Sequence, residues 1–424
     1  MEAWGVIIVG GGASGLTAAI EAAGQLGPGR VLLLERGSRV GKKLLATGNG
    51  RCNLSNRQAG LSHYHGRDPG FVLPALRRFP VKSTLDFFYK FGLVTVEEED
   101  GKLYPRSLQA SAVLDLLRME AERLGVETRC DREVTEVRPQ KGRFLVTAGE
   151  ETFAGQTVIL AAGGAASSGL GGCELGYALL EKLGHRRTPL LPAIVQLKAD
   201  TTHIRPLAGT KADGVVTLPG KSPAQQAGEI LFTDYGISGP PVMSLSSLVT
   251  RRLAAGPVTL FLDLAPDLAE ERLLRLLSGR KQARSDKTLE VFLVGFFPKR
   301  VGQCALKAAG ILPLSRTAGS LSPRELEALA RQLKHWPVTI TGTNGMKNAQ
   351  VTAGGIETAG FDPETMESRL VPGLYGCGEV LDIDGDCGGY NLQWAWSSGR
   401  LAGSSAARLI SPRQTGKEKR RNGA

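Results

Sequence analysis

The stretch Val6-Ile7-Ile8-Val9-Gly10-Gly11-Gly12-Ala13-Ser14-Gly15 decides the fold class of this 424-residue chain. Its first four residues are apolar and β-branched, which is typical of a buried parallel strand. The remainder matches G-x-G-x-x-G, a turn that joins a strand to a helix in dinucleotide-binding proteins. A helix is predicted over residues 14–27 and a second strand over 31–34. Together these elements predict a βαβ unit with a nucleotide at its glycine turn.

The glycine turn has a physical reason at each position. Gly10 permits a tight turn, Gly12 lets a pyrophosphate approach the backbone, and Gly15 lets the helix pack closely on the strand. The helix begins near Ala13 and Ser14, so its N-terminus offers free N–H groups and the positive end of its dipole to phosphate. The turn is therefore predicted to hold the phosphates of a dinucleotide.

The end of the second strand supplies the expected ribose contact. Glu35 follows Gly15 by twenty residues and is placed to hydrogen-bond ribose hydroxyls, which disfavours a 2′-phosphate. Arg36 either stacks on the adenine or lies in solvent. The fingerprint itself does not separate FAD from NAD. The long polar loop over residues 41–53 favours FAD, because its backbone donors and small polar side chains suit a larger cofactor.

Glycine is also the anomaly of the composition. The chain has 55 glycines in 424 residues, about 13% against a usual level of about 7%. They show no Gly-X-Y period, which excludes collagen. They cluster instead, as expected where backbone must turn or approach a ligand closely. The composition thus also indicates a nucleotide-binding enzyme.

The sequence argues against several other classes of protein. It contains no run of 18 or more apolar residues, so a membrane span is not expected. Its N-terminus lacks a basic region, so a secretory signal is not expected. Six scattered cysteines without a C-x-x-C motif fit a reducing cytoplasm better than a disulfide framework or a zinc site. His63 and His65 form the only close histidine pair, and no third ligand is nearby in sequence, so no metal site is predicted.

The net charge of +11 is concentrated in two segments. Residues 275–334 carry 12 Lys and Arg against 4 Asp and Glu, and residues 411–424 carry 5 against 1. A flavoprotein that binds or modifies nucleic acid through these segments is therefore an open alternative. Against it, the aromatic residues of the basic segment, Phe292, Phe296 and Phe297, lie in an apolar run and offer no evident platform for stacking bases. We therefore do not expect a nucleic-acid partner.

The character of the chain changes twice along its length. Apolar strands that end at glycine recur up to Val158–Ala162 and return from about Val351. Between them, residues 190–265 alternate short β-like runs with Pro and Gly, which indicates a small barrel or sheet. Residues 267–334 are basic and helical, and Ser322 followed by Pro323 marks a helix start. The chain is thus expected to leave its first domain, build an insertion and return.

Long irregular strings carry a more specific signal than the glycine turn. They are Gly41–Asn56 (GKKLLATGNGRCNLSN), Gly228–Pro240 (GEILFTDYGISGP), Val351–Gly355 (VTAGG), Thr365–Ser368 (TMES) and Gly373–Gly403, around GLYGCGEVLDIDGDCGGYNLQWAWSSG. On these strings the chain resembles, over about residues 5–405, bacterial FAD-dependent oxidoreductases of the aminoacetone-oxidase-like group. That group includes a bile-acid-inducible enone reductase branch. One departure is residues 165–172 (AASSGLGG), where relatives often carry a Ser/Thr-Gly-Asp-like step.

The resemblance implies an α/β protein with a discontinuous, Rossmann-like FAD-binding domain of the glutathione-reductase type. An inserted β-barrel-like domain and a small helical domain would interrupt it. The expected bounds are 1–189 and 350–411 for the FAD-binding domain, 190–266 and 335–349 for the barrel-like insert, 267–334 for the basic helical subdomain, and 412–424 for a basic disordered tail.

The resemblance also implies the residues that contact FAD. The glycine turn and second strand would hold the adenosine and pyrophosphate, and the loop after Gly41 and the C-terminal segment would line the rest. The turn 388–391 is expected to present backbone N–H groups to the flavin. The implied contacts are Gly10, Gly12, Ala13, Ser14, Gly15, Glu35, Arg36, Lys43, Thr47, Gly48, Arg51, Cys52, Asn53, the backbone of Val134, Ala162, Gly163, Gly378, Glu379, Asp384, Gly389, Asn391 and Leu392.

The predicted function follows from one dinucleotide site. A flavin would carry the redox chemistry, and the absence of a second fingerprint indicates that NAD(P)H would meet the flavin only transiently. Tyr235 and Ser238, on a loop of the insert, and Tyr390 are pocket candidates, because a hydroxyl near a flavin can donate a proton. The sequence predicts a cytoplasmic FAD-dependent oxidoreductase acting on a small organic substrate. A flavin-bound sensor without turnover stays open, and the sequence specifies neither the substrate nor an oligomeric state.

Overall fold

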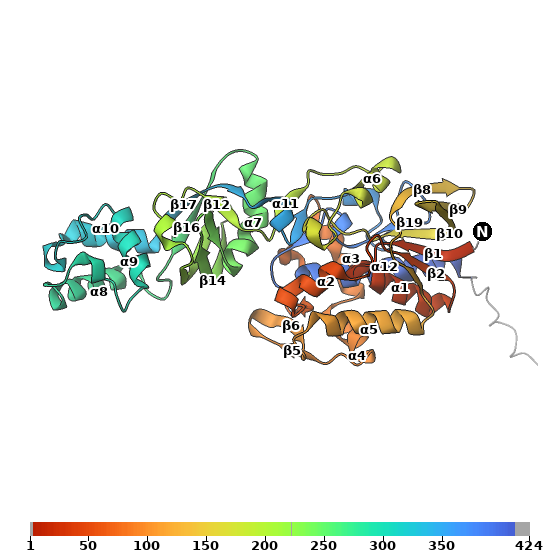
Figure 1. The fold of residues 1–424 in the computed structure, drawn as a ribbon, viewed down its shortest axis with the longest axis horizontal. Helices are drawn as coiled ribbons and strands as arrows, with labels where there is room; N and C mark the ends of the chain where they lie inside the picture. The colour runs from red at the N-terminus through yellow and green to blue at the C-terminus, as the bar shows by residue number, and fades with distance from the viewer. Residues whose placement is uncertain (1–2, 222, 412–424) are drawn as a thin grey trace, which may run out of the picture. The chain divides into compact units, whose positions relative to one another are not determined.

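The computed structural model describes residues 3–221 and 223–411, so the predicted tail over 412–424 lies outside the described residues. The chain forms two compact units. Unit 1 consists of the chain up to Leu190 and from Thr352 onward, and unit 2 consists of Leu191–Val351. Figure 1 shows unit 1 built around a sheet with helices and unit 2 built from a strand barrel and a group of helices.

The central sheet of unit 1 has the strand order β7–β2–β1–β10–β9–β8, and β19 also pairs with β10. The pairs β1–β2, β1–β10, β2–β7 and β10–β19 are parallel, whereas β8, β9 and β10 pair antiparallel. The apolar strands β1 and β2 are buried along almost their whole length, as expected of parallel strands covered on both faces. The bounds are β1 Ala3–Val9, β2 Val31–Leu34, β7 Glu127–Arg129, β8 Val134–Gln140, β9 Arg143–Ala148, β10 Glu151–Leu160 and β19 Leu374–Gly376.

Two helices from opposite ends of the chain pack together on this sheet. They are α1 (Ala13–Leu26) and α12 (Tyr390–Ile410). A Cβ atom added at Gly399 would lie 2.4 Å from the Ser14 carbonyl oxygen, and one added at Gly403 would lie 2.3 Å from that of Ala18. Only glycine allows the two helix backbones to come this close. The C-terminal segment is thereby held beside the glycine turn.

Smaller elements complete unit 1. β20 pairs with β4, and β3, β6 and β5 form a three-stranded sheet. The strands are β3 Ser55–Asn56, β4 Tyr64–His65, β5 Thr95–Glu97, β6 Lys102–Pro105 and β20 Asp384–Gly385. β18 (Val351–Ala353) begins at the last residue of unit 2 and continues into unit 1. The helices are α2 Lys42–Ala46, α3 Leu73–Arg78, α4 Val81–Lys90, α5 Ala110–Arg123 and α6 Leu175–Lys182.

Unit 2 contains a closed antiparallel barrel in the order β12–β15–β14–β13–β16–β17. Along β13 the buried and more exposed side chains alternate, as the pleat of a barrel strand requires. The strands are β12 Leu197–Ala199, β13 Lys211–Leu218, β14 Ala224–Phe232, β15 Gly236–Ser238, β16 Val258–Asp263 and β17 Trp336–Thr343. β11 (Leu191–Ala193), α7 (Pro240–Leu253) and α11 (Gly345–Asn348) also belong to this unit.

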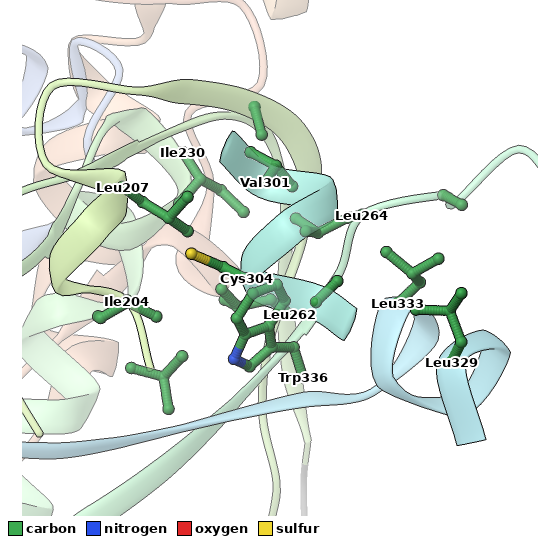
Figure 2. Packing of buried hydrophobic residues seen from close by; sticks show 14 of the residues in the cluster. Ile204, Leu207, Ile230, Leu262, Leu264, Val301, Cys304, Leu329, Leu333 and Trp336 are labelled. Atoms are coloured by element: carbon green, nitrogen blue, oxygen red, sulfur yellow. The ribbon is translucent and has the colours of Figure 1, made fainter. Parts of the chain in front are cut away.

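The helical segment of unit 2 shares its core with the barrel. It consists of α8 (Glu270–Ala283), α9 (Lys299–Ala308) and α10 (Pro323–Lys334). Figure 2 shows Trp336 and Leu262 of the barrel strands in one cluster with Cys304 of α9 and Leu333 of α10. Trp336 is 1% exposed and Leu262 is fully buried. Because the apolar contacts are continuous, the barrel and the helices stabilise each other.

The structure confirms the predicted α/β class with a Rossmann-like sheet, a barrel and a helical segment. It differs locally from the sequence prediction. The loop expected over 41–53 contains helix α2, because Lys42–Ala46 are good helix formers. The apolar positions of α7, including Val242, Leu245 and Val249, were not recognised as a helix.

Candidate functional site

The candidate site of unit 1 lies where four parallel strands end. β1, β2, β10 and β19 run in the same direction, so the segments after them meet at one edge of the sheet. These segments are 10–12, 35–37, 161–164 and 377–379. In open α/β sheets, ligands bind outside the carboxyl ends of the strands. The fold therefore gathers there four of the segments that the sequence analysis selected.

The glycine turn has the geometry that its sequence predicts. Gly10 has a φ of +106°, and a Cβ atom there would lie 2.5 Å from the Ala161 carbonyl oxygen. A Cβ atom at Gly15 would lie 1.9 Å from the Gly10 carbonyl oxygen. Gly12 differs, because no atom lies within 4 Å of the position of its missing Cβ. Gly12 is also the N-cap of α1 and provides no side-chain cap, so the first N–H groups of α1, at Ala13 and Ser14, are left for a ligand.

Glu35 braces the glycine turn. Its Oε2 accepts a hydrogen bond of 2.8 Å from the N–H of Gly11, and its Oε1 accepts one of 2.7 Å from the N–H of Gly37. A carboxylate has about four lone-pair sites, so capacity for ribose hydroxyls is left over. Arg36 is exposed, and its Nη2 donates a hydrogen bond of 3.1 Å to the carbonyl of Gly171. Arg36 thus ties the end of β2 to the segment that departs from the family pattern.

Lys43 and Glu379 join the first loop to the C-terminal segment. The Lys43 Nζ lies 3.0 Å and 2.8 Å from the two carboxylate oxygens of Glu379. Glu379 also accepts a hydrogen bond of 2.8 Å from the N–H of Thr352. A Cβ atom at Gly164 would lie 2.4 Å from the Glu379 Oε1, so a larger residue would push the carboxylate away. The side chains of Lys43 and Glu379 are 30% and 21% exposed, which leaves them accessible to a ligand.

The loop from Thr47 to Asn53 has an unusual backbone. Gly48 and Cys52 have φ angles of 57° and 58°, and for the non-glycine Cys52 this conformation is strained. The Asn53 Oδ1 is buried and has no hydrogen-bond partner within the described residues. Arg51 pairs with Glu98 and lies over the ring of Tyr104, 4.3 Å from its centroid. A buried acceptor without a donor beside strained backbone is typical of a ligand site.

The C-terminal segment contacts both the glycine turn and this loop. A Cβ atom at Gly378 would lie 2.5 Å from the Ser14 Oγ. Gly389 has a φ of +99°, and a Cβ atom there would lie 2.8 Å from the unpartnered Asn53 Oδ1. Asn391 donates to and accepts from the backbone of Gly385, at 2.7 Å and 2.8 Å. Asn391 therefore holds the turn before α12 in shape.

The surroundings of the other predicted cofactor residues are as follows. Val134 is buried at the start of β8, and Asp384 is fully buried in β20. Gly163 has a φ of +74° and no atom within 4 Å of its missing Cβ. Ala162 precedes it, Thr47 donates a hydrogen bond to the carbonyl of Leu44, and Leu392 is half-buried in α12. That these residues contact FAD stays a prediction.

The three pocket candidates are divided between the units. Ser238 is a buried residue of β15, not a loop residue as expected, because its segment pairs with β14 in the barrel. Tyr235 is half-buried just before it, and its carbonyl accepts a hydrogen bond from Ala199. Tyr390 is the first residue of α12 in unit 1 and is 5% exposed.

The sequence analysis missed one cluster beside Tyr390. Asp386 lies between His63 and His65, with its two carboxylate oxygens 3.0 Å and 2.7 Å from the His63 Nδ1 and the His65 Nε2. The His-x-His spacing was the only available signal, because Asp386 lies more than 300 positions away in sequence. Among the described residues, no group of three or more His, Cys, Asp or Glu is arranged to hold a metal ion.

We expect the cysteines of the site to be inert thiols. Cys52 and Cys377 are fully buried, and burial raises the pKa of each thiol to about 12 from an ordinary value near 9. At pH 8 about one molecule in ten thousand would carry either thiolate. Ellman's reagent at pH 8 should therefore leave both unmodified in the native protein while the partly exposed Cys173 reacts, as mass spectrometry of the peptides would show.

The same pKa shifts have a consequence for stability at high pH. Because the folded protein holds both thiols neutral, their contribution is fully present below pH 9 and is lost as the pH rises from about 9 towards 12. The free energy of unfolding should fall over that range. Rapid labelling of Cys52 in the native protein would show that its thiol is neither buried nor held neutral.

None of the helices in the described parts of the chain has the length and hydropathy that crossing a membrane requires.

Comparisons with known proteins place this site in a family context. A family model described as HI0933-like protein Rossmann domain matches residues 4–405. A protein of Clostridium scindens named 3-dehydro-bile acid delta(4,6)-reductase is 42% identical over 403 residues, which cover 94% of this chain and 98% of that protein. A protein of Escherichia coli named ribosomal RNA dihydrouridine synthase is 33% identical over 401 residues, covering 94% and 96%. The predicted resemblance is thereby confirmed.

Among solved structures, a quinol–fumarate reductase with menaquinol matches with a TM-score of 0.50 at 16% sequence identity. The match covers 99% of this chain and 73% of that one. At this level of identity the likeness concerns the fold alone.

Proposed function

The chain belongs to the HI0933-like Rossmann family, and from this premise we propose that it is an FAD-dependent oxidoreductase. Its reaction would be the reduction of a C=C bond conjugated to a carbonyl in a small organic substrate, with NAD(P)H as the electron donor. The observation that supports this most is the 42% identity to the bile-acid reductase over 94% of the chain. The edge of the unit 1 sheet, with open space at Gly12 and free N–H groups at the start of α1, also supports it.

The names of the two relatives share one chemistry. A 3-dehydro bile acid with double bonds at positions 4 and 6 has C=C bonds conjugated to a ketone. Uridine has a C=C bond conjugated to a ring carbonyl, and dihydrouridine is its reduced form. Both named activities, one in Clostridium scindens and one in Escherichia coli, therefore add two hydrogens across an activated C=C bond. This common reaction supports an activity of the same type for the present chain.

The residues at the sheet edge fit FAD. The open position at Gly12 and the N-terminus of α1 would receive the pyrophosphate, and Glu35 has acceptor capacity left for ribose hydroxyls. The unpartnered Asn53 Oδ1 would accept a hydrogen bond from an N–H of the cofactor or from the O–H of a bound water. When bound, FAD would supply two-electron chemistry, since it accepts a hydride from a donor and, once reduced, passes a hydride to the substrate. The chain's own residues would bind the pyrophosphate and the ribose and so orient the cofactor.

The direct experiment is spectroscopic and then kinetic. Purified protein should be yellow and should hold one FAD for each chain, released by denaturation. Under anaerobic conditions NAD(P)H should bleach the flavin, and a 3-oxo steroid acid with a double bond at position 4 should restore its colour. Colourless protein that takes up no FAD would refute the proposal. Bound flavin that no reductant and acceptor pair can cycle would indicate the non-catalytic sensor.

A second candidate, reduction of uridine in ribosomal RNA, is favoured by the Escherichia coli relative and by the basic helical segment. On α9, Lys299, Arg300 and Lys307 are exposed. Unmodified ribosomal RNA should then restore the flavin colour, and changing these three residues to Gln should weaken RNA binding and its salt dependence. If the steroid acid is reduced and RNA is not, this candidate is removed.

A further inference from the structure

Two imidazoles share one carboxylate at the start of α12. His63 ends a short 3₁₀ turn, His65 ends β4, and Asp386 follows β20. The antiparallel pairing of β4 with β20 sets Asp384 opposite His65 and Gly385 opposite Tyr64. The N–H of Asp386 then donates a hydrogen bond of 2.9 Å to the His63 carbonyl. The backbone therefore fixes the carboxylate between the two rings.

This arrangement fixes the position of the protons on both rings. A carboxylate oxygen can only accept, so the His63 Nδ1 and the His65 Nε2 must carry hydrogen. The opposite nitrogens, His63 Nε2 and His65 Nδ1, are then the atoms that exchange a proton. The side chains of His63, His65 and Asp386 are 26%, 19% and 17% exposed, so the cluster is sheltered but open to a ligand or to water.

Tyr390 connects this cluster to α12. Its ring stacks on His63 with centroids 4.2 Å apart and an interplanar angle of 11°. Its carbonyl accepts a hydrogen bond of 3.0 Å from the Tyr64 hydroxyl. Burial first, and then Asp386, Asp100 and Cys387, raise the pKa of Tyr390 to about 12. Tyr390 therefore stays neutral at physiological pH and provides a flat, uncharged cover for one face of His63.

The cluster is hydrogen-bonded to the predicted cofactor turn over residues 388–391. Asn391, a predicted FAD contact, donates to the carbonyls of Gly385 and Asp386 at 2.7 Å and 3.3 Å. Gly389 lies against the unpartnered Asn53 Oδ1. The segment 385–391 thus contains both Asp386 and the expected cofactor contacts Gly389 and Asn391.

We propose that His63 is the proton donor of this site. Asp386 and His65 are positioning residues: Asp386 fixes the tautomer of His63, and His65 shares the same carboxylate. This inference rests on the proposed reduction. Reduction of the conjugated C=C bond breaks the π bond and forms two C–H bonds. Bound FAD, once reduced by NAD(P)H, would supply the hydride and its electron pair to the β-carbon, and His63 would give its proton to the α-carbon. His63 is reprotonated from water through the cluster.

His63→Gln should reveal the proton transfer when the two half-reactions are separated. Bleaching of the flavin by NAD(P)H should stay within about threefold of wild type, since it needs no proton on the substrate. Reoxidation of the reduced flavin by the steroid acid, followed as the return of flavin absorbance, should slow by at least about 100-fold, the usual contribution of a general acid. His65→Gln is the matched control, because it touches the other oxygen of Asp386, and it should slow recolouring by less than about tenfold.

A second readout does not need turnover. Long-range ¹H–¹⁵N spectra of the five histidines should show hydrogen on Nδ1 of His63 and on Nε2 of His65, in the FAD-free and the loaded protein. Asp386→Asn should remove this preference for His63. The rate at which substrate reoxidises the flavin of the Asp386→Asn variant should also fall, and the pH dependence of that rate should change. The FAD affinity of this variant, measured by fluorescence quenching, should stay the same.

The outcomes separate the two proposals. If wild-type protein binds FAD but no conjugated C=C substrate restores its colour, the proposed function fails and the tautomers of the cluster can still be as described. If wild type reduces such a substrate and His63→Gln does so equally fast, the assignment of His63 is overturned. Charged groups beside the cluster, including Asp100 and the Lys102 that pairs with it, would then be the remaining modulators of the pH profile.

Discussion

Replacing Gly12 with Asp should weaken FAD binding by at least about 100-fold, or about 2.8 kcal/mol, and leave unit 1 folded. Gly12 has a φ of −81° and open space where a side chain would be, so the substitution causes no strain or clash. Asp is also a good N-cap and should stabilise α1 by a few tenths of a kcal/mol. Its carboxylate would occupy the N–H groups of α1 and repel a pyrophosphate. Fluorescence titration of the FAD-free protein measures the affinity.

The matched control for this variant is Gly24→Asp. Gly24 lies in the same helix, is exposed, and likewise has no atom within 4 Å of its missing Cβ. The added charge is the same, but it lies near the far end of α1. FAD affinity should stay within about twofold of wild type, with a small loss of stability from the helix dipole. Equal affinities of the Gly12 and Gly24 variants would show that the pyrophosphate is not held at the glycine turn.

Replacing Gly15 with Ala should destabilise unit 1 by about 3 kcal/mol or more and abolish FAD binding. The added Cβ would lie 1.9 Å from the Gly10 carbonyl oxygen, which is backbone, so α1 must move away from β1. Overpacking usually costs about 1–3 kcal/mol, and here no flexible side chain can yield. Denaturant unfolding followed by tryptophan fluorescence reports mainly on unit 1, because Trp4, Trp394 and Trp396 lie there and Trp336 lies in unit 2.

Gly24→Ala makes the same chemical change in the same helix, but it should raise the free energy of unfolding where Gly15→Ala lowers it. Gly24 lies in a helical conformation with open space around it, so alanine should stabilise by about 0.5–1 kcal/mol through a less flexible unfolded chain. If Gly15→Ala proved as stable as Gly24→Ala, the close approach of α1 to β1 would be wrong.

The predictable parts of this protein depend on residues close together in sequence. The stretch from Val6 to Gly15 specifies strand, turn and helix within ten residues. Ser322 with Glu325 specifies the start of α10, where both hydrogen bonds of a capping box are present. In each case local backbone sterics and unsatisfied helix N–H groups decide the structure. Neighbouring residues alone provide that information.

The rest of the site depends on contacts between distant segments. His63 and Asp386 are separated by 323 positions, and only the pairing of β4 with β20 brings them together. The Lys43–Glu379 pair spans 336 positions, and Gly399 acquires its role only when α12 packs on Ser14 of α1. A histidine pair without a third ligand in sequence gave no reason to expect a bridging carboxylate.

The sequence by itself determined that this protein contains a βαβ dinucleotide fold, because a glycine turn between a buried strand and a helix has one stable geometry. The tertiary structure decided which side chains face that turn. Return of the chain after unit 2 places residues 377–391 beside the turn and the first loop, and side chains acquire partners there that no local pattern encodes. The Lys43–Glu379 ion pair and the tautomers of His63 and His65 therefore depend on the packing of distant segments against each other.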